Sequence, residues 1–243
     1  MSILTRSTET LRSMARGLLA QDCLLCGASS SEDLFCPPCA ASLPLLEGGR
    51  CPQCAMPNPT AERCGRCLTH RPHFDSATAP YRYAFPLDKL VQSYKYAHRL
   101  AIGNWFGEQM ARRALSDALL TDIDFILPLP LHPRRLIERG FNQALELARP
   151  IAAALGKPLA PALCRRVRHT PIQAALPWKE RAANIRGAFH CPGDLSQRHI
   201  LLVDDVMTSG ASLDECARTL KLHGAATVRV LVLARALPKG VGD

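Results

Sequence analysis

The chain has 243 residues, of which 47% are hydrophobic and 21% are charged. This composition excludes an intrinsically disordered chain, and the length allows a full-sized domain with a smaller second unit. No apolar stretch is long enough for a transmembrane helix, so we expect a globular, cytoplasmic protein. The formal net charge of +9 favours polyanionic partners such as phosphates, pyrophosphate or nucleic acid.

Residues 1–22 combine basic and aliphatic side chains at helical spacing. Arg6, Arg12 and Arg16 occur among leucines, which predicts an amphipathic N-terminal helix. The segment lacks the apolar block and the small-residue cleavage site of a secretory signal. A transit peptide is an alternative, but we expect a helix that packs on the following domain.

Residues 23–75 contain eight of the 11 cysteines, arranged as four Cys-x-x-Cys pairs. The interval between the first two pairs equals that between the last two. Tetrahedral Zn²⁺ takes four thiolates, and each pair can supply two of them from one tight turn. We therefore predict a double zinc ribbon with two structural zinc sites, ligated in chain order by Cys23, Cys26, Cys36 and Cys39 and by Cys51, Cys54, Cys64 and Cys67.

Other interpretations of these cysteines stay open. The pairs can be crossed between the two sites, and an iron–sulfur cluster is a minor alternative. Redox dithiols lack the expected βαβ context here, and disulfides would require an oxidising compartment. The module has few large apolar residues, so the metal must supply much of its folding energy. The three isolated cysteines are expected to be buried or incidental, namely Cys164, Cys191 and Cys216.

Residues 76–237 predict a larger second domain. A strand is expected over 77–84, then a helix from Pro86 and another from about 101 to 115. Lys95 belongs to a basic cluster that directly follows the apolar stripe of the first helix. It is either a solvated helix residue or a ligand of pyrophosphate.

The next segment is rich in guanidinium groups. A strand over 125–131 runs into a loop that contains Arg134 and Arg135. Their planar guanidinium groups can bind pyrophosphate oxygens in pairs. A helix is expected over 143–155, kinked at Pro150. The basic segment 165–189 is either a surface loop or a mobile lid over a charged substrate.

The stretch 199–212 gives the clearest indication of a ligand-binding site. Its apolar run 200–203 predicts a strand buried on both faces, followed by a loop over 204–212 and a helix whose capping box pairs Ser212 with Glu215. Ligands bind at this place in open α/β sheets. An ordinary strand-to-helix turn with solvated acids is the alternative.

A ribose 5-phosphate fits the side chains of this stretch. Asp204 and Asp205 can accept hydrogen bonds from sugar hydroxyls or hold a hydrated Mg²⁺. The phosphate would bind at the N-terminus of the helix, where backbone N–H groups and hydroxyls gather. Its predicted ligands are Thr208, Ser209, Gly210, Ala211 and Ser212. A last strand over 228–233 follows. Residues 234–236 would form a hood over the acceptor base or amine, and a loose tail is expected over 238–243.

Residues Val203 to Ser212 resemble the phosphoribosyl pyrophosphate loop of type I phosphoribosyltransferases. The run from Glu138 to Gln143 is similar to that of the ComF/GntX family of phosphoribosyltransferase-like proteins, and so are the segment starting at Arg168 and the double zinc ribbon. The resemblance covers about residues 20–235, and Pro150 is a small departure from it.

The resemblance implies an α/β fold of the type I phosphoribosyltransferase class, with a mainly parallel central sheet flanked by helices and preceded by the small zinc module. It also implies that Asp204 and Asp205 hold the ribose, that Arg134 and Arg135 lie near pyrophosphate, and that a flexible catalytic loop runs from Arg168 to Arg181. The family is associated with DNA uptake and with gluconate use.

Three functions remain open from the sequence. The first is transfer of ribosyl phosphate from phosphoribosyl pyrophosphate, with Mg²⁺ neutralising the leaving group. The second is a non-catalytic protein of the transformation machinery that binds single-stranded DNA or a nucleotide and meets DNA-uptake proteins. The third is a sensor that binds phosphoribosyl pyrophosphate without chemistry.

Overall fold

The computed structural model of the chain describes residues 21–31, 33–97, 99–120, 122–170 and 183–238. The chain divides into two compact units, residues 1–43 and 44–243. The predicted N-terminal helix lies outside the described residues, except for Gln21 and Asp22, which form a strand. Within the described part of the chain, no helix is long and apolar enough to cross a membrane.

The first unit is built from short elements around four cysteines. Strand β1 (Gln21–Asp22) pairs antiparallel with β2 (Ser29–Ser31), and helix α2 (Pro37–Ala41) follows. Among the described residues of this unit, the large apolar side chains that are buried are Phe35 and Leu43. So small an apolar core needs an additional source of stability, which a bound metal can provide.

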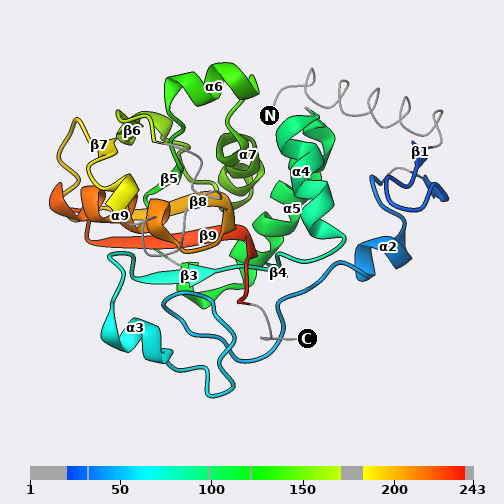
Figure 1. Cartoon of the computed structure of the whole chain (residues 1–243), viewed down its shortest axis with the longest axis horizontal. Coiled ribbons are helices and arrows are strands. Elements are labelled where there is room, and N and C mark those ends of the chain that lie inside the picture. The colour runs from blue at the N-terminus through cyan, green and yellow to red at the C-terminus, as the bar shows by residue number, and fades with distance from the viewer. Residues whose placement is uncertain (1–20, 32, 98, 121, 171–182, 239–243) are drawn as a thin grey trace. The chain divides into compact units, whose positions relative to one another are not determined.

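A parallel sheet forms the centre of the second unit, with the strand order β3-β9-β8-β5 (Figure 1). Its strands are β3 (Ser76–Thr78), β9 (Thr227–Arg235), β8 (His199–Met207) and β5 (Phe125–Pro128), and the short β4 (Tyr81–Arg82) pairs with the end of β9. All these pairings are parallel. The predicted α/β class with a parallel sheet is confirmed, and the apolar runs of β8 and β9 are buried as central strands should be.

Helices cover both faces of the sheet. Helices α5 (Leu100–Ser116) and α7 (Gln143–Leu155) pack on each other and on the sheet, next to α4 (Leu87–Tyr96). Helix α9 (Ala211–Leu222) covers the opposite face (Figure 1). The strands therefore bury side chains on both sides, as alternation along a strand requires.

Short elements complete the second unit. They are α3 (Gly65–Thr69) among the later cysteines, η1 (Ala118–Leu120), α6 (Pro133–Arg139), η2 (Pro161–Leu163), and the antiparallel pair β6 (Arg165–Arg166) and β7 (Phe189–His190). The expected α4, α5 and α7 are all present. Pro150 lies inside α7 and packs against Gly107 of α5, where an added Cβ would come within 2.8 Å of the proline ring.

Three sequence predictions about element ends are wrong. The strand expected to stop at Val203 continues to Met207, because β9 pairs with it as far as Arg235. The expected capping box fails, since Gly210 is the N-cap of α9 and Glu215 instead binds Arg218 and the N–H of Gly187. The strand expected over 77–84 is two short strands, β3 and β4.

Candidate functional site

The two acids lie at the end of β8, inside the strand rather than in the loop after it. Asp204 is in register with Val232 of β9. The Nζ atom of Lys95, at the end of α4, lies 2.7 Å from Oδ2 of Asp205, and these side chains are only 19% and 8% exposed. Successive strand residues point to opposite faces, so Asp204 is directed away from Lys95. Lys95 is therefore an ion-paired residue of the site and not a solvated one.

The charges of this region influence one another. Burial raises the pKa of Asp204 to about 7, and the neighbouring Asp205 carboxylate acts in the same direction, against the opposing effect of Lys95. Burial by itself would lower the pKa of Lys95, but the attraction of Asp205 outweighs it and the pKa is raised. The protonation of Asp204 and that of Lys95 therefore depend on the charges gathered at this end of the strand.

The loop after β8, which contains the predicted phosphate ligands, turns at a left-handed glycine. Gly210 adopts a φ of +80°, and an added Cβ would meet the Met207 side chain at 2.9 Å. Ser209 is buried, and its Oγ accepts a hydrogen bond from the N–H of Ala211. A small cavity of about 40 Å³ is lined by Asp204 and by residues 206–213. All five predicted phosphate ligands therefore surround one hollow at the start of α9.

The two arginines predicted to bind pyrophosphate lie on α6, beyond the end of β5. Arg134 is exposed, while Arg135 is partly buried, with its Nε 3.9 Å from Glu138 Oε2. His132 is the N-cap of α6, and its Nδ1 accepts the N–H of Arg134. Burial, His169 and the nearby arginines lower the pKa of His132. The pyrophosphate role of Arg134 and Arg135 remains a prediction.

The run Glu138 to Gln143 forms the connection between α6 and α7. Gly140 ends α6 in the left-handed conformation, and Asn142 caps α7 while donating to the carbonyl oxygen of Leu129. Gln143 is buried, accepts from Arg139 at 2.8 Å through Oε1, and accepts from the hydroxyl of Tyr94 through its backbone oxygen. This run therefore fixes Arg139 beside α4, near the two acids.

Arg139 belongs to the candidate site because its charge acts on the residues at the end of β8. Its guanidinium lies 5.7 Å from the ring centroid of Tyr96. Its charge also acts on Asp204 and on Lys95. Lys95 and Arg139 therefore both contribute positive charge at the end of β8.

The predicted flexible loop is described only at its ends. Arg168 donates to the carbonyl oxygens of Arg186 and Asn184, at 2.6 and 3.1 Å, and so ties these ends together. Arg181 lies outside the described residues. The catalytic roles predicted for Arg168 and Arg181 remain predictions.

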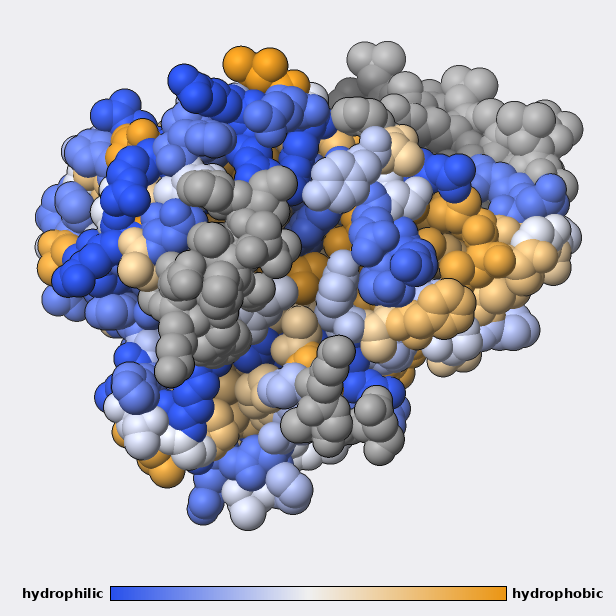
Figure 2. Space-filling model, in the orientation of Figure 1, coloured by the Kyte–Doolittle hydropathy of each residue, from blue (hydrophilic) through white to orange (hydrophobic). Residues whose placement is uncertain are grey.

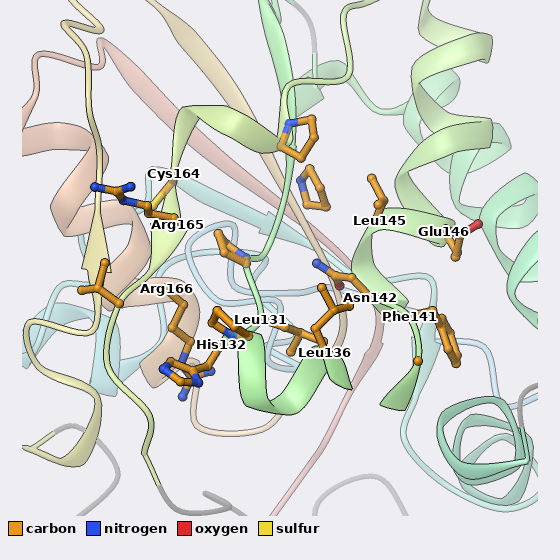
Figure 3. A pocket seen from close by; sticks show the side chains of 16 residues that line it. Leu131, His132, Leu136, Phe141, Asn142, Leu145, Glu146, Cys164, Arg165 and Arg166 are labelled. Carbon is orange, nitrogen blue, oxygen red and sulfur yellow. The ribbon is translucent and has the colours of Figure 1, made fainter. Parts of the chain in front are cut away.

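A larger cavity of about 710 Å³ is lined by residues of α6, of the start of α7 and of β6. Figure 3 shows His132 and Arg166 close together at one end, Leu131, Leu136 and Asn142 in the middle, and Phe141 at the other end. The surface over α6 and the β6–β7 pair is largely hydrophilic, with apolar colour in separate spots (Figure 2). One exposed apolar residue of this region is Ile137.

The eight predicted metal ligands form two groups, paired in chain order as predicted. Within each group all Sγ atoms lie within 4.8 Å of one another. In each Cys-x-x-Cys turn, the residue after the second cysteine donates its N–H to the carbonyl oxygen of the first cysteine. The four turns therefore have the same hydrogen-bond pattern. These bonds are Gly27 to Cys23, Ala40 to Cys36, Ala55 to Cys51 and Leu68 to Cys64.

The geometry of both groups fits tetrahedral zinc. The Sγ atoms of Cys26 and Cys36 are 3.6 Å apart, as are those of Cys54 and Cys64. A tetrahedron with Zn–S bonds of about 2.3 Å has S–S edges of about 3.8 Å. Burial raises the pKa of Cys51, but hydrogen bonds from backbone N–H groups, that of Cys64 foremost, outweigh it and lower the pKa to about 7. Four thiolates leave no open position, so these are structural sites.

The second group, Cys51, Cys54, Cys64 and Cys67, lies against residues 207–212, which contain the predicted phosphate ligands and are called the phosphate loop below. Arg235 is 1% exposed, and it donates to the carbonyl oxygens of Cys54, Met207 and Thr208. Arg66, inside the last Cys-x-x-Cys, donates to the carbonyl oxygen of Ser209 at 3.0 Å. Sequence reasoning missed Arg66, and it placed Arg235 only within the predicted hood of residues 234–236 and not beside the cysteines or the loop. The available signals were an arginine between two metal ligands and a cation at the end of an apolar strand.

These features define a class: an α/β protein of the phosphoribosyltransferase type with two Cys₄ clusters. The family model of the phosphoribosyl transferase domain matches residues 142–240, and that of the double zinc ribbon domain matches residues 14–68. The chain is 35% identical over 192 residues to the DNA utilization protein YhgH of Salmonella typhi, covering 77% of this chain and 84% of the relative. The chain therefore belongs to the ComF/YhgH family of proteins with a double zinc ribbon and a phosphoribosyltransferase domain.

Two competence proteins also match most of the chain. Competence protein F of Haemophilus influenzae is 33% identical over 186 residues, covering 72% of this chain and 80% of the relative. Competence protein ComFC of Bacillus subtilis is 27% identical over 235 residues, covering 88% and 94%. Among solved structures, the glutamine phosphoribosylpyrophosphate amidotransferase of B. subtilis covers 58% of this chain and 30% of its own, with 17% identity and a TM-score of 0.41.

Proposed function

We propose that this protein binds phosphoribosyl pyrophosphate with Mg²⁺ at the end of β8. One observation carries the proposal: Asp204 and Asp205 lie in the last part of the buried strand β8, and the loop after this strand passes through the left-handed Gly210 into the N-terminus of α9. Carboxylates suit the ribose hydroxyls, and the N–H groups of a helix start suit the 5-phosphate. The two halves of the ligand thus meet complementary groups at one edge of the sheet.

The reaction that follows is transfer of the ribosyl phosphate to an acceptor, with release of pyrophosphate. Positive charge develops at the anomeric carbon, and the carboxylates of Asp204 and Asp205 are suited to stabilise it. The positive side chains around the strand end, Lys95 and Arg139, are suited to the leaving group, with Arg134 and Arg135 on the loop beyond. Bound Mg²⁺ would neutralise part of the pyrophosphate charge.

The biological setting follows from the relatives. Proteins with similar sequences carry the names DNA utilization protein and competence protein. We therefore place the reaction in the uptake or use of DNA, in a cytoplasm that keeps the zinc thiolates reduced.

Calorimetric titration of the zinc-loaded protein with phosphoribosyl pyrophosphate and Mg²⁺ tests the binding. Two lysines of α4 give a matched pair: Lys95 contacts Asp205, whereas Lys89 is 65% exposed and pairs with Asp88 at 3.7 Å. Lys95→Met should weaken binding about tenfold or more, and Lys89→Met should leave it unchanged. Asp205→Asn should weaken binding as well. Absence of binding by the unaltered protein would refute the proposal.

A second candidate function has its own support. The net charge of +9 and exposed arginines such as Arg134 and Arg168 suit a polyanion, and the names of the relatives refer to DNA. This protein would bind single-stranded DNA or a nucleotide without chemistry. Affinity for a single-stranded oligonucleotide should then fall steeply as salt rises. Binding of phosphoribosyl pyrophosphate without pyrophosphate release in any acceptor screen would instead identify a sensor.

A further inference from the structure

The phosphate loop is held from its outer side by two arginines. The carbonyl oxygens of Met207, Thr208 and Ser209 are consecutive, and each accepts from a guanidinium group. A loop whose carbonyls are fixed on one side directs its N–H groups toward the other side. Anion-binding loops depend on such N–H groups being presented together. The arginines therefore stabilise the backbone shape that a phosphate needs.

Both arginines depend on the second cysteine group. Arg66 is separated from Cys64 and Cys67 by no more than one residue, so the last turn of that group determines where its guanidinium lies. Arg235 binds the carbonyl oxygen of Cys54 at 2.9 Å through Nε. Cys51, Cys54 and Cys67 are also part of the apolar core that contains Met207 and Leu213. The metal ligands and the loop are thus one packed structure.

The charge of the metal centre matters for Arg235. This guanidinium is buried, and a buried charge is costly unless a counter-charge lies nearby. Four thiolates around Zn²⁺ carry a net charge of about −2. Without metal the cysteine turns of this group would lose the bonds that join them, and with them the fixed position of the Cys54 carbonyl oxygen that Arg235 binds. Metal loading therefore favours the arrangement in which Arg235 holds Met207 and Thr208.

We propose that the second cysteine group, acting through Arg235 and Arg66, holds the phosphate loop in its anion-binding shape, so that metal occupancy of this group controls the affinity for a sugar phosphate. The identity of the ligand rests on the proposed function, but the effect on the loop does not. The first cysteine group belongs to the other unit and should lack this effect.

Paired variants of the full-length protein test this coupling. Cys64→Ser removes one metal ligand from the second group, and Cys26→Ser removes one from the first. The zinc content per chain reports how much metal each variant loses. Arg66→Ala removes one guanidinium at an exposed position, and Arg66→Lys restores its charge. Arg71 lines the same 540 Å³ cavity between the cysteine turn and the loop, so Arg71→Ala is the matched control.

Two readouts apply to each variant. The first is amide hydrogen exchange of residues 208–212, followed by mass spectrometry without ligand. The second is calorimetric affinity for phosphoribosyl pyrophosphate with Mg²⁺. We expect Cys64→Ser and Arg66→Ala to accelerate exchange and to weaken binding about tenfold, with partial rescue in Arg66→Lys and no change in Cys26→Ser or Arg71→Ala.

The possible results separate the two proposals. Unchanged exchange in both Cys64→Ser and Arg66→Ala would overturn the coupling, and so would an equal effect of Cys26→Ser. If exchange responds as expected but the unaltered protein does not bind phosphoribosyl pyrophosphate, the loop is coupled to the metal and the proposed function is wrong.

Discussion

The two cysteine groups have the same spacing and the same hydrogen-bonded turns, yet their surroundings differ. The first group lies in a unit whose described residues bury two large apolar side chains, Phe35 and Leu43. The second is part of the main apolar core, together with Phe74 and side chains of β8, β9 and α9. Its backbone also accepts a hydrogen bond from the buried Arg235.

This difference shows that ligand spacing identifies a metal site but not its role. Each group can fold its own short segment around zinc. In the second group the same chemistry additionally positions a neighbouring loop, because that loop packs on the cysteines and its carbonyl oxygens accept hydrogen bonds from the arginines beside them. Two sites that look alike in sequence should therefore respond very differently to mutation.

The largest contrast is expected from truncating one phenylalanine in each unit. Phe35 and Phe74 are both 2% exposed. Phe74→Ala should cost about 3–5 kcal/mol in the second unit, because a cavity opens in the core that carries the phosphate loop. Phe35→Ala should cost a similar amount in the first unit only. Hydrogen exchange measured separately for peptides from 21–43 and 44–238 checks both.

Binding supplies the control for this pair. Phe35→Ala should retain the affinity for phosphoribosyl pyrophosphate, whereas Phe74→Ala should lose it. If Phe35→Ala reduced protection in β8 as much as Phe74→Ala does, the two units would behave as one cooperative body, and the contrast between the cysteine groups would be wrong.

A smaller contrast is expected from pH. The pKa of Asp204 is about 7 in the folded protein, above the value of about 3.9 expected when unfolded. Between these values the folded state keeps a proton that the unfolded state has lost, so the stability of the second unit should fall as pH rises from about 4 to about 7. Asp204→Asn should remove this fall and stabilise the unit at pH 8 by roughly 2–4 kcal/mol.

Denaturant titrations at pH 4 to 8, read through peptides of β8 and α9, measure this effect. Peptides of residues 21–43 provide an internal reference, because Asp204 belongs to the other unit. A stability of the second unit that rises over the same pH range, or that Asp204→Asn leaves unchanged, would contradict the assigned burial of this carboxyl group.

Local patterns in the sequence were sufficient for much of the fold and for the metal sites. The apolar runs predicted β8 and β9, the helical stripes predicted α4, α5 and α7, and the Cys-x-x-Cys intervals predicted both groups of ligands. These features depend on periodicity and short-range spacing. The acids, the glycine turn and the helix start were likewise encoded in one continuous stretch.

The features that sequence reasoning missed depend on distant pairings. Asp204 and Asp205 lie in the strand because β9 extends alongside them, which the apolar run alone cannot reveal. Arg235 binds the backbone of Cys54, and Arg66 binds the backbone of Ser209. In each pair the two residues are more than 140 positions apart in the sequence. A cation within a strand end becomes informative only once the fold shows what surrounds it.

The smallest effect is expected at the His73–Asp214 pair, which links the end of the second cysteine segment to the first turn of α9. Oδ1 of Asp214 lies 2.9 Å from Nδ1 of His73 and accepts its backbone N–H at 2.6 Å, but the side chains are 48% and 37% exposed. Solvent screening therefore limits the loss in Asp214→Asn to about 0.2–1 kcal/mol.

The matched control is Arg149→Gln, which breaks the exposed pair of Arg149 with Glu146 on α7. Both variants should lose similarly little stability, and less at high salt. Only Asp214→Asn should accelerate exchange in the first turn of α9, because it also removes a negative charge from the positive end of that helix. Equal exchange in the two variants would mean that Arg66 and Arg235 connect the cysteine group to the loop without help from this pair.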